Sequence, residues 1–210
     1  MCRQRRIHVT PGASFPTFTR GILLTGLDQL WVADITYVHL AEEFGYLAVI
    51  LDAFSRKVVG WALEAHLHAE LAISALMMAI AARQPIPGAL IHHSDRGVQY
   101  ACTEYTEILA AHDIQPSMSR VGNPYDKAKA ESFMKTLKQE EINGSSYRNL
   151  RQARGAVGAF IETVYSQRLH SALAYRSPDE YEATLGRSSE VTSSPEKLDH
   201  RELLPISCLT

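Results

Sequence analysis

The sequence predicts an α/β domain built on a mixed five-stranded sheet, because three kinds of segment follow one another in a telling order. Apolar segments rich in β-branched and aromatic residues lie at 30–40, 46–54 and 58–63, separated only by short turns. Strands spaced in this way form an antiparallel meander. An Ala-, Leu- and Met-rich helix follows at 69–82, and a β-α-β section at 89–117 comes next. We therefore expect three antiparallel strands, then β-α-β, with helices flanking the sheet.

Two amphipathic helices follow these segments. Asn123 and Pro124 suit the N-cap and first position of a helix that runs to about Ile142. The apolar stripe of this helix contains Ala130, Phe133 and Leu137. Its opposite face carries Lys127, Glu131, Lys135 and Lys138. Apolar residues at 150, 153, 157, 161 and 164 predict the second helix, and a short helical piece follows at 179–185.

The chain of 210 residues is long enough for one domain with tails. Residues 1–27 are interrupted by proline and glycine, so we expect an extended arm or the remnant of a linker. Residues 28–185 form the predicted core domain. Residues 186–210 are rich in serine, proline and glutamate, which predicts a disordered tail.

Composition limits the compartment. No apolar run is long enough to span a membrane, and no apolar segment follows the basic N-terminus, so we expect neither an anchor nor a secretory signal. Cys2, Cys102 and Cys208 lie far apart, which argues against a zinc site or a disulfide framework. We therefore expect a reducing, cytoplasmic setting.

The net charge of −2 conceals a segregation of charge. Residues 1–20 carry four arginines and no acidic residue, and residues 120–176 carry ten Lys or Arg against five Asp or Glu. A basic segment on an acidic protein can be a binding surface for nucleic acid. The alternative is a solvated helical face, and charge alone favours it.

Asp34 lies in the middle of an otherwise apolar predicted strand, LWVADITYVHL. A carboxylate inside a buried strand costs several kcal/mol unless another group pairs with it. We interpret Asp34 as a metal ligand on a central strand. A core aspartate that pairs with an arginine or caps a turn is an equally good interpretation of this residue alone.

Two further carboxylates are candidates for the same site. Asp95 directly follows the fourth predicted strand, where loops expose side chains, although it could be a simple turn residue. Glu131 could merely pair with Lys127 and Lys135 along its helix. Together, three carboxylates suit two hard cations such as Mg²⁺, which would activate an in-line phosphoryl displacement. The lysines beside Glu131 would then face a phosphate backbone.

Five ordered motifs resemble the catalytic domain of insertion-sequence-three family transposases, which are related to retroviral integrases in the aspartate–aspartate–glutamate group. They are WVADITY at 31–37, LDAFSRKVVGW at 51–61, HSDRGVQY at 93–100, NPYDKAKAESFMKTLK at 123–138, and RLHSAL at 168–173 with Pro178 beyond it. Thirty-five residues separate Asp95 from Glu131, a spacing typical of this group. The resemblance covers about residues 28–182.

The resemblance implies a ribonuclease H-like fold in which Asp34, Asp95 and Glu131 are the catalytic, metal-binding triad. It implies two Mg²⁺ ions, for which Mn²⁺ could substitute. The expected activity is metal-dependent cleavage at the ends of a mobile element, followed by attack of the freed 3′-hydroxyl on another DNA strand. The chain would then be a polynucleotidyl transferase that works during transposition, in the bacterial cytoplasm at the nucleoid.

The resemblance also implies partners. We expect the element ends and target DNA to contact Lys127, Lys135, Lys138 and Arg168, although Arg168 and His170 could instead pack the last helix. A homodimer or larger assembly is expected on DNA. Family members often carry an upstream helix-turn-helix, which a separate reading frame could supply here, so we hypothesise a truncated copy.

Alternative interpretations remain open at this point. The chain could be a non-catalytic DNA-binding or multimerising remnant that modulates a full-length transposase, or a related nuclease without strand transfer. Asp52, just before a turn, is expected to be structural. His92 and His93 are adjacent in a strand and so point to opposite faces, which argues against a shared site.

Overall fold

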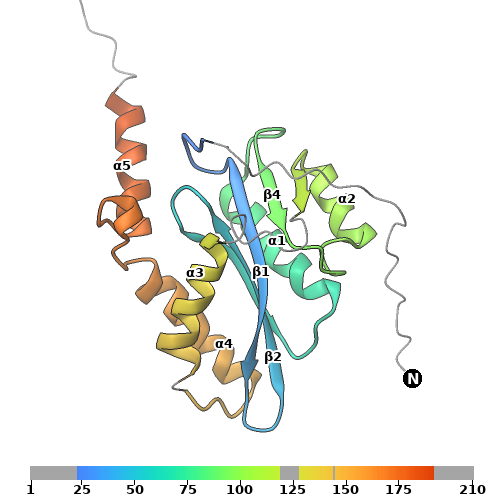
Figure 1. The fold of residues 1–210 in the computed structure, drawn as a ribbon. Coiled ribbons are helices and arrows are strands. Elements are labelled where there is room, and N and C mark those ends of the chain that lie inside the picture. Colours follow the sequence, from blue (N-terminus) through green and yellow to red (C-terminus); the bar gives the residue numbers. More distant parts are fainter. Residues whose placement is uncertain (1–22, 119–127, 144, 192–210) are drawn as a thin grey trace, which may run out of the picture.

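The computed structural model describes residues 23–118, 128–143 and 145–191, and its centre is a single five-stranded sheet (Figure 1). The strands are β1 Leu30–His39, β2 Phe44–Asp52, β3 Val58–Glu64, β4 Ile91–Ser94 and β5 Gln115–Met118. They lie side by side in the order β3-β2-β1-β4-β5. The first three are antiparallel, whereas β4 runs parallel to β1 and to β5. The predicted mixed sheet is therefore confirmed.

Helices cover both faces of this sheet (Figure 1). One face is covered by α1, Ala69–Arg83, and α2, Thr103–Ala111. The other is covered by α3, Ala128–Leu137, and α4, Leu150–Ala159. No helix in the described part of the chain is both long and apolar enough to cross a membrane.

The side chains of β1 alternate between the two cores. Trp31 and Ala33 belong to the cluster beneath α1 and α2, whereas Val32 and Val38 belong to the cluster beneath α3 and α4. Residues on successive positions of a strand point to opposite faces. The first half of β1 is thus buried on both sides, which explains its uninterrupted apolar sequence up to Asp34.

Helix α1 lies unusually close to β3 because of Gly60. A Cβ atom at this position would lie 2.2 Å from the Ala75 carbonyl oxygen and 2.8 Å from the Ala79 Cβ atom. Only glycine leaves room for the helix backbone at this distance. The close contact fixes the height of α1 above the sheet.

Both helices on the other face continue into π-helical turns. α3 passes into the turn Lys138–Ile142, and α4 passes into the turn Phe160–Tyr165. The predicted end of the first helix, about Ile142, is therefore right, and the second helix includes position 164 as expected, although the Val164 side chain is exposed. The change of helix type has no sequence signal. A short 3₁₀ turn at Ser171–Leu173 leads toward the last helix, α5.

Helix α5 spans Pro178–Val191, so it continues past residue 186, where a disordered tail was expected to begin. The helix starts with a capping box, in which the Glu180 N–H donates to the Ser177 hydroxyl and the Ser177 N–H donates to the Glu180 carboxylate. A cap of this kind stabilises the first turn of a helix by about 1 kcal/mol, and the helix continues through Gly186. The expected arm at 1–22, Lys127 and residues 192–210 lie outside the described residues.

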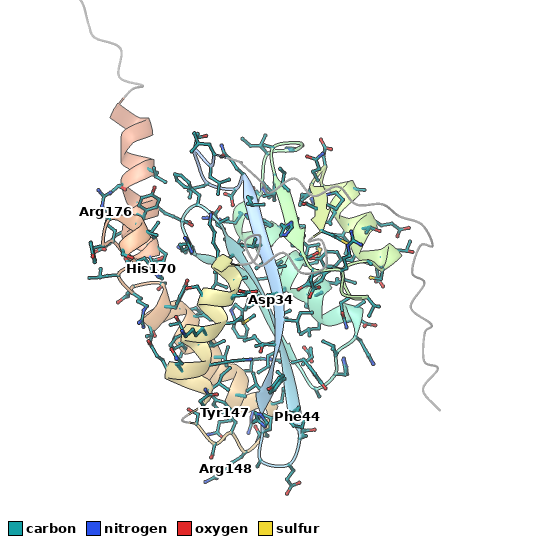
Figure 2. All side chains as sticks on the ribbon, in the orientation of Figure 1. Asp34, Phe44, Tyr147, Arg148, His170 and Arg176 are labelled. Atoms are coloured by element: carbon teal, nitrogen blue, oxygen red, sulfur yellow. The ribbon has the colours of Figure 1, made fainter. Side chains whose placement is uncertain are left out.

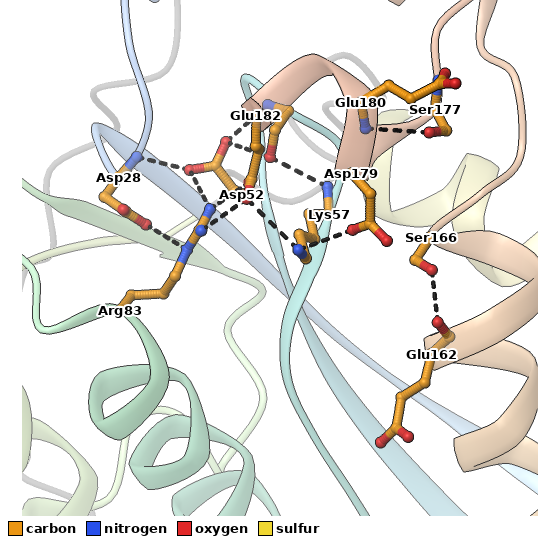
Figure 3. A network of polar contacts seen from close by, with 11 residues as sticks. Asp28, Asp52, Lys57, Arg83, Glu162, Ser166, Ser177, Asp179, Glu180 and Glu182 are labelled. Atoms are coloured by element: carbon orange, nitrogen blue, oxygen red, sulfur yellow. Dashed lines mark hydrogen bonds and ion pairs between the residues drawn. The ribbon is translucent and has the colours of Figure 1, made fainter. Parts of the chain in front are cut away.

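A polar network fastens α5 to the body of the domain (Figure 3). The guanidinium of Arg83 donates to both carboxylate oxygens of Glu182, at 2.9 and 2.5 Å, and to Asp28 at 3.1 Å. Lys57 pairs with Asp179 at 2.8 Å. Arg83 thus joins Asp28, which precedes β1, to Glu182 in the last helix.

Candidate active site

Asp34 lies halfway along the central strand β1, opposite Val49 of β2, and its side chain is partly buried (Figure 2). On the other side, β4 pairs with β1 only from Leu30 to Val32, where Val32 lies opposite His93. Asp95 is the first residue after β4, which ends at Ser94. The sheet therefore places Asp34 on β1 and Asp95 just beyond the end of the neighbouring strand β4, although they come from distant parts of the sequence.

Asp95 has a local role in its own turn. Its Oδ1 atom accepts a hydrogen bond from the Gly97 N–H at 2.8 Å. A Cβ atom on Gly97 would lie only 2.7 Å from that same oxygen, so any other residue at position 97 would push the Asp95 carboxylate out of this arrangement. The alternative interpretation of Asp95 as a turn residue is thus correct for one of its oxygens, and the turn orients its carboxylate.

A buried tyrosine lies within electrostatic reach of both Asp34 and Asp95. The Tyr100 side chain is 2% exposed, and its hydroxyl has no hydrogen-bond partner among the described residues. Burial, followed by the charges of Tyr105, Asp34 and Asp95, raises the pKa of Tyr100 well above its ordinary value. Both carboxylates therefore act on the same buried hydroxyl, which the sequence analysis did not single out.

Glu131 is placed by the amphipathic pattern of α3. The predicted stripe of Ala130, Phe133 and Leu137 is fully buried against the sheet. Glu131 directly follows Ala130, so it lies at the edge of this buried stripe, where its side chain is exposed. In the described part of the chain no ion pair joins Glu131 to Lys135, so the ladder that would have explained Glu131 as structural is not formed there.

Asp34 and Glu131 line one pocket of about 470 Å³ between β1 and the α3 helix. The remaining lining residues are Ile35, Thr36, Met134, Lys135, Lys138, Gln139 and Asn143. Gln139 lies within the π-helical turn and Asn143 directly follows it. In this turn the Asn143 N–H donates to the Lys138 carbonyl oxygen at 2.8 Å. This i to i+5 spacing places Asn143 under Lys138, whereas an α-helix would place the buried Ile142 there.

The donor set of the pocket suits a hard cation. Asp34 and Glu131 offer carboxylate oxygens, and Thr36, Gln139 and Asn143 add neutral oxygens. Among the described residues, however, no three His, Cys, Asp or Glu side chains lie close enough to share one metal ion. The residues present fit Mg²⁺ in kind, and the role of the three carboxylates as a triad stays a prediction.

The predicted DNA-binding residues fall into two groups. Lys135 and Lys138 line the pocket of Asp34 and Glu131. Arg168 lies elsewhere, and its guanidinium pairs with the Glu140 carboxylate at 2.5 Å. The neighbouring His170 packs its ring against Tyr165, with 5.2 Å between centroids. Arg168 and His170 thus help to pack the segment before α5, and DNA binding by Arg168 stays a prediction.

Three other polar residues behave as the sequence suggests. Asp52 is 0% exposed and accepts the N–H groups of Asp28, Phe54 and Ser55 at 2.6–2.8 Å, as expected of a structural aspartate. His92 contacts the Tyr105 hydroxyl, whereas His93 contacts the Ser117 hydroxyl at 3.0 Å. The two histidines serve different partners and form no shared site.

Two family models, both described as the integrase core domain, match residues 25–124 and 112–178. Together these matches span most of the chain. The chain therefore belongs to the integrase core domain family.

Curated relatives narrow the comparison to bacterial insertion sequences. The transposase for insertion sequence element IS904 of Lactococcus lactis is 42% identical over 159 residues, covering 75% of this chain and 62% of the relative. Transposase InsF for insertion sequence IS3A of Escherichia coli K12 is 40% identical over 159 residues, covering 75% and 55%. The predicted resemblance to insertion-sequence-three transposases is confirmed. The chain spans only about three fifths of the length of these relatives.

Solved structures share the fold at low sequence identity. A chain of the simian T-cell lymphotropic virus intasome in complex with PP2A regulatory subunit B56 gamma has a TM-score of 0.61 at 19% identity, covering 96% of this chain and 66% of that one. The dimeric HTLV-2 integrase catalytic core domain in complex with magnesium has a TM-score of 0.57 at 19% identity, covering 77% and 99%. The predicted ribonuclease H-like fold is confirmed.

Proposed function

We propose that the chain is a transposase catalytic core that cleaves DNA strands at the ends of a mobile element and joins the freed 3′-hydroxyl to another strand. The observation that carries this proposal is the single pocket in which Asp34 and Glu131 lie beside Lys135 and Lys138. A phosphodiester substrate needs carboxylates that hold cations and lysines that attract phosphate. The relatives named as transposases support the same activity.

Asp34, Asp95 and Glu131 would hold two Mg²⁺ ions, or Mn²⁺ in their place. Their oxygen donors fit these hard cations, and the HTLV-2 integrase core in complex with magnesium supports the choice. When bound, such ions activate the attacking oxygen and stabilise the charge on the leaving one.

The chain's own residues would bind and orient the DNA. Lys135 and Lys138 lie in the wall of the pocket, where they would attract the phosphate next to the bond to be cleaved. Lys127 and Arg168 would contact phosphates farther away. Tyr100 adds no negative charge beside Asp34 and Asp95 at neutral pH, because the ordinary pKa of tyrosine is 10 and burial raises it further here.

Partners and location are also part of the proposal. The DNA would be the element ends and a target, and a homodimer or larger assembly would bring two ends together. The HTLV-2 integrase core, which has dimeric and trimeric forms, supports self-association. An upstream helix-turn-helix protein could supply end recognition, and the bacterial nucleoid would be the site of action.

The proposal can be tested with the full chain and DNA that carries the terminal sequences of its own element. Cleavage and joining are measured with Mg²⁺, with Mn²⁺ and with a chelator. We expect Glu131→Gln and Asp34→Asn each to lower activity by about 10²–10³-fold or more, because each removes a charge that the reaction needs. The matched control is Glu107→Gln, which changes an exposed carboxylate on α2, across the sheet.

Metal binding provides a second readout that does not depend on activity. Titration of Mn²⁺, followed by calorimetry, should show weaker binding in Glu131→Gln than in Glu107→Gln. Equal cleavage by the wild type and Glu131→Gln would contradict the proposal. DNA binding without product in either protein would favour the non-catalytic remnant, and nicking without joining would favour a simple nuclease.

A further inference from the structure

A cluster of aromatic rings lies on the surface of the β1–β2 hairpin, next to its turn. Tyr37 and Phe44 are 51% and 48% exposed. Their ring centroids are 6.0 Å apart. The centroid of the His39 ring lies 5.4 Å from that of Tyr37 and 4.8 Å from that of Phe44. We call Tyr37, His39 and Phe44 the aromatic ledge. Large apolar rings are usually buried, so a half-exposed cluster of them needs a reason.

Stabilisation of the hairpin accounts for only part of this cluster. His39 and Phe44 lie directly opposite each other across the two strands, and such pairs contribute to hairpin stability. Tyr37 has a different partner across the strands, Tyr46, yet half of its surface remains in water. The exposed halves of Tyr37 and Phe44 are therefore available to a ligand.

Lys138 connects the ledge with the candidate active site. Its Nζ atom lies 4.9 Å from the centre of the Tyr37 ring, and its side chain also lines the pocket of Asp34 and Glu131. Asp34 and Tyr37 point to opposite faces of β1, about 10 Å apart along the strand. Lys138 reaches both because β4 pairs with β1 only as far as Val32, and the described residues add no strand to this edge before Leu40.

Charges around the ledge define which ligand it suits. Lys138 lies on one side, and the exposed Arg148 follows Tyr147, whose backbone pairs with Leu40 at the same end of the hairpin (Figure 2). Glu42 and Glu43 lie in the hairpin turn and would repel phosphate there. Half-exposed aromatic rings with a cation against one of them and a second cation at the same end of the hairpin match a single strand of nucleic acid, whose bases stack while its phosphates pair with the cations.

We propose that the aromatic ledge binds unpaired bases of the DNA strand that leaves the candidate active site over the open edge of β1. The proposal rests on the proposed function, because it makes the ledge part of the same DNA path. Tyr37 and Phe44 each stack against a base, and Lys138 holds the phosphate between the pocket and the ledge. Stacking on an aromatic face tolerates any base, so the ledge confers little sequence preference.

The test compares the binding of single-stranded and blunt duplex oligonucleotides by the full chain, measured by fluorescence anisotropy with a chelator to prevent cleavage. The double variant Tyr37→Leu/Phe44→Leu should bind the single strand about tenfold or more weakly, because two stacking contacts are lost. Its affinity for the duplex should change by less than about twofold. The control Tyr37→Phe/Phe44→Tyr keeps both rings and should bind like the wild type.

A second measurement uses the wild type and so does not depend on the folding of a variant. A strand that contains 5-iodouracil is irradiated, and crosslinked peptides are identified by mass spectrometry. Crosslinks at Tyr37 or Phe44 support the proposal, whereas crosslinks only elsewhere overturn it. Unchanged binding, equal losses for single strand and duplex, or a variant that loses only self-association in sedimentation experiments would also overturn it.

These outcomes are distinct from those that test the proposed function. Failure of the ledge leaves the loss of cleavage in Glu131→Gln untouched. Conversely, if Glu131→Gln cleaves normally, the proposed function fails, while the anisotropy and crosslinking results still decide whether the ledge binds single strands.

Discussion

Asp52 and Glu131 are two carboxylates that the sequence places on the same small domain, but their surroundings are opposite. Asp52 is fully buried at the end of β2, where three backbone N–H groups and the Ser55 hydroxyl donate to it and Arg83 lies 4.0 Å away (Figure 3). Glu131 is exposed in the wall of a pocket that also holds Asp34 and two lysines. The protein supplies every donor that Asp52 needs, whereas the pocket of Glu131 is accessible to an outside cation.

This difference teaches how to separate structural from functional carboxylates. Burial raises the pKa of Asp52, while the N–H donors around it oppose that rise and keep the charge tolerable. Such a group stabilises the fold and cannot bind a second partner without unfolding its turn. A carboxylate that serves catalysis must instead be reached by substrate, so its removal should cost activity and little stability.

The largest expected effect is on stability at Asp52. Asp52→Ala leaves buried N–H donors and the Arg83 charge without their acceptor, so the free energy of unfolding should fall by about 3–5 kcal/mol. Glu131→Gln, at an exposed position, should change it by less than about 0.5 kcal/mol. Urea denaturation followed by circular dichroism measures both. Similar losses of stability for the two variants would show that Asp52 and Glu131 do not differ in their contribution to the fold.

The second prediction concerns acid. Burial lowers the pKa of His92 from 6.5 to about 4, so between these two pH values the unfolded chain binds a proton at His92 that the folded chain does not bind. Stability from this group is complete above pH 6.5 and is lost as the pH falls toward 4, a loss of about 3 kcal/mol. His92→Gln should show a correspondingly flatter acid dependence of urea midpoints. His66→Gln, at an exposed histidine, should keep the wild-type profile, and a reversal of these two results would refute the assignment.

The third effect is on the attachment of α5. Glu182→Gln removes the charge that pairs with both nitrogens of Arg83, at a position only 12% exposed, and should cost about 1.5–3 kcal/mol. Hydrogen exchange should show that α5 opens faster in Glu182→Gln than in the wild type, and that the change in α5 is larger than the change in α1. Glu162→Gln is the control, because only the backbone carbonyl of Glu162 takes part in the contacts of Figure 3 and its carboxylate is exposed. Unchanged exchange in Glu182→Gln would mean that apolar contacts such as Phe54 with Tyr181 hold the helix alone.

The smallest effect separates the cations near the pocket from those already paired. If Lys135 binds a phosphate, Lys135→Gln should lower the slope of log affinity against log salt by about 0.9 for duplex DNA. Arg168→Gln should lower it less, because Glu140 already neutralises the guanidinium. Filter binding at several salt concentrations gives both slopes. An Arg168 slope change as large as that of Lys135 would show that DNA displaces Glu140.

The sequence was sufficient for much of the fold because its signals are local. The apolar, β-branched and aromatic composition of 30–40, the turn after Asp52 and the buried stripe of α3 each follow from neighbouring residues, and the strand, turn and stripe are each present in the structure. The position of Asp34 in a central strand was predictable for the same reason. The parallel pairing that brings Asp95 toward it was predictable only as part of a β-α-β section.

Other features of the site depend on contacts between distant residues and leave no local pattern. Gln139 and Asn143 reach the pocket because the helix widens into a π-turn, which no propensity indicates. The pairing of Arg168 with Glu140 and the stacking of Lys138 on Tyr37 are likewise tertiary. The buried hydroxyl of Tyr100 becomes visible as part of the site only once the strands are assembled.

The widened turn at Lys138–Ile142 has a consequence for how the chain tolerates changes in length. A π-turn holds one residue more than the α-helix it interrupts, so losing Gln139 would let Lys138 and Asn143 stay aligned at ordinary helical spacing. The same loss one turn earlier, within α3, would rotate Glu131 relative to its apolar anchors. This stretch can therefore lose or regain a residue without moving the carboxylate, so a change of length here would alter the rim of the pocket and leave Glu131 in place.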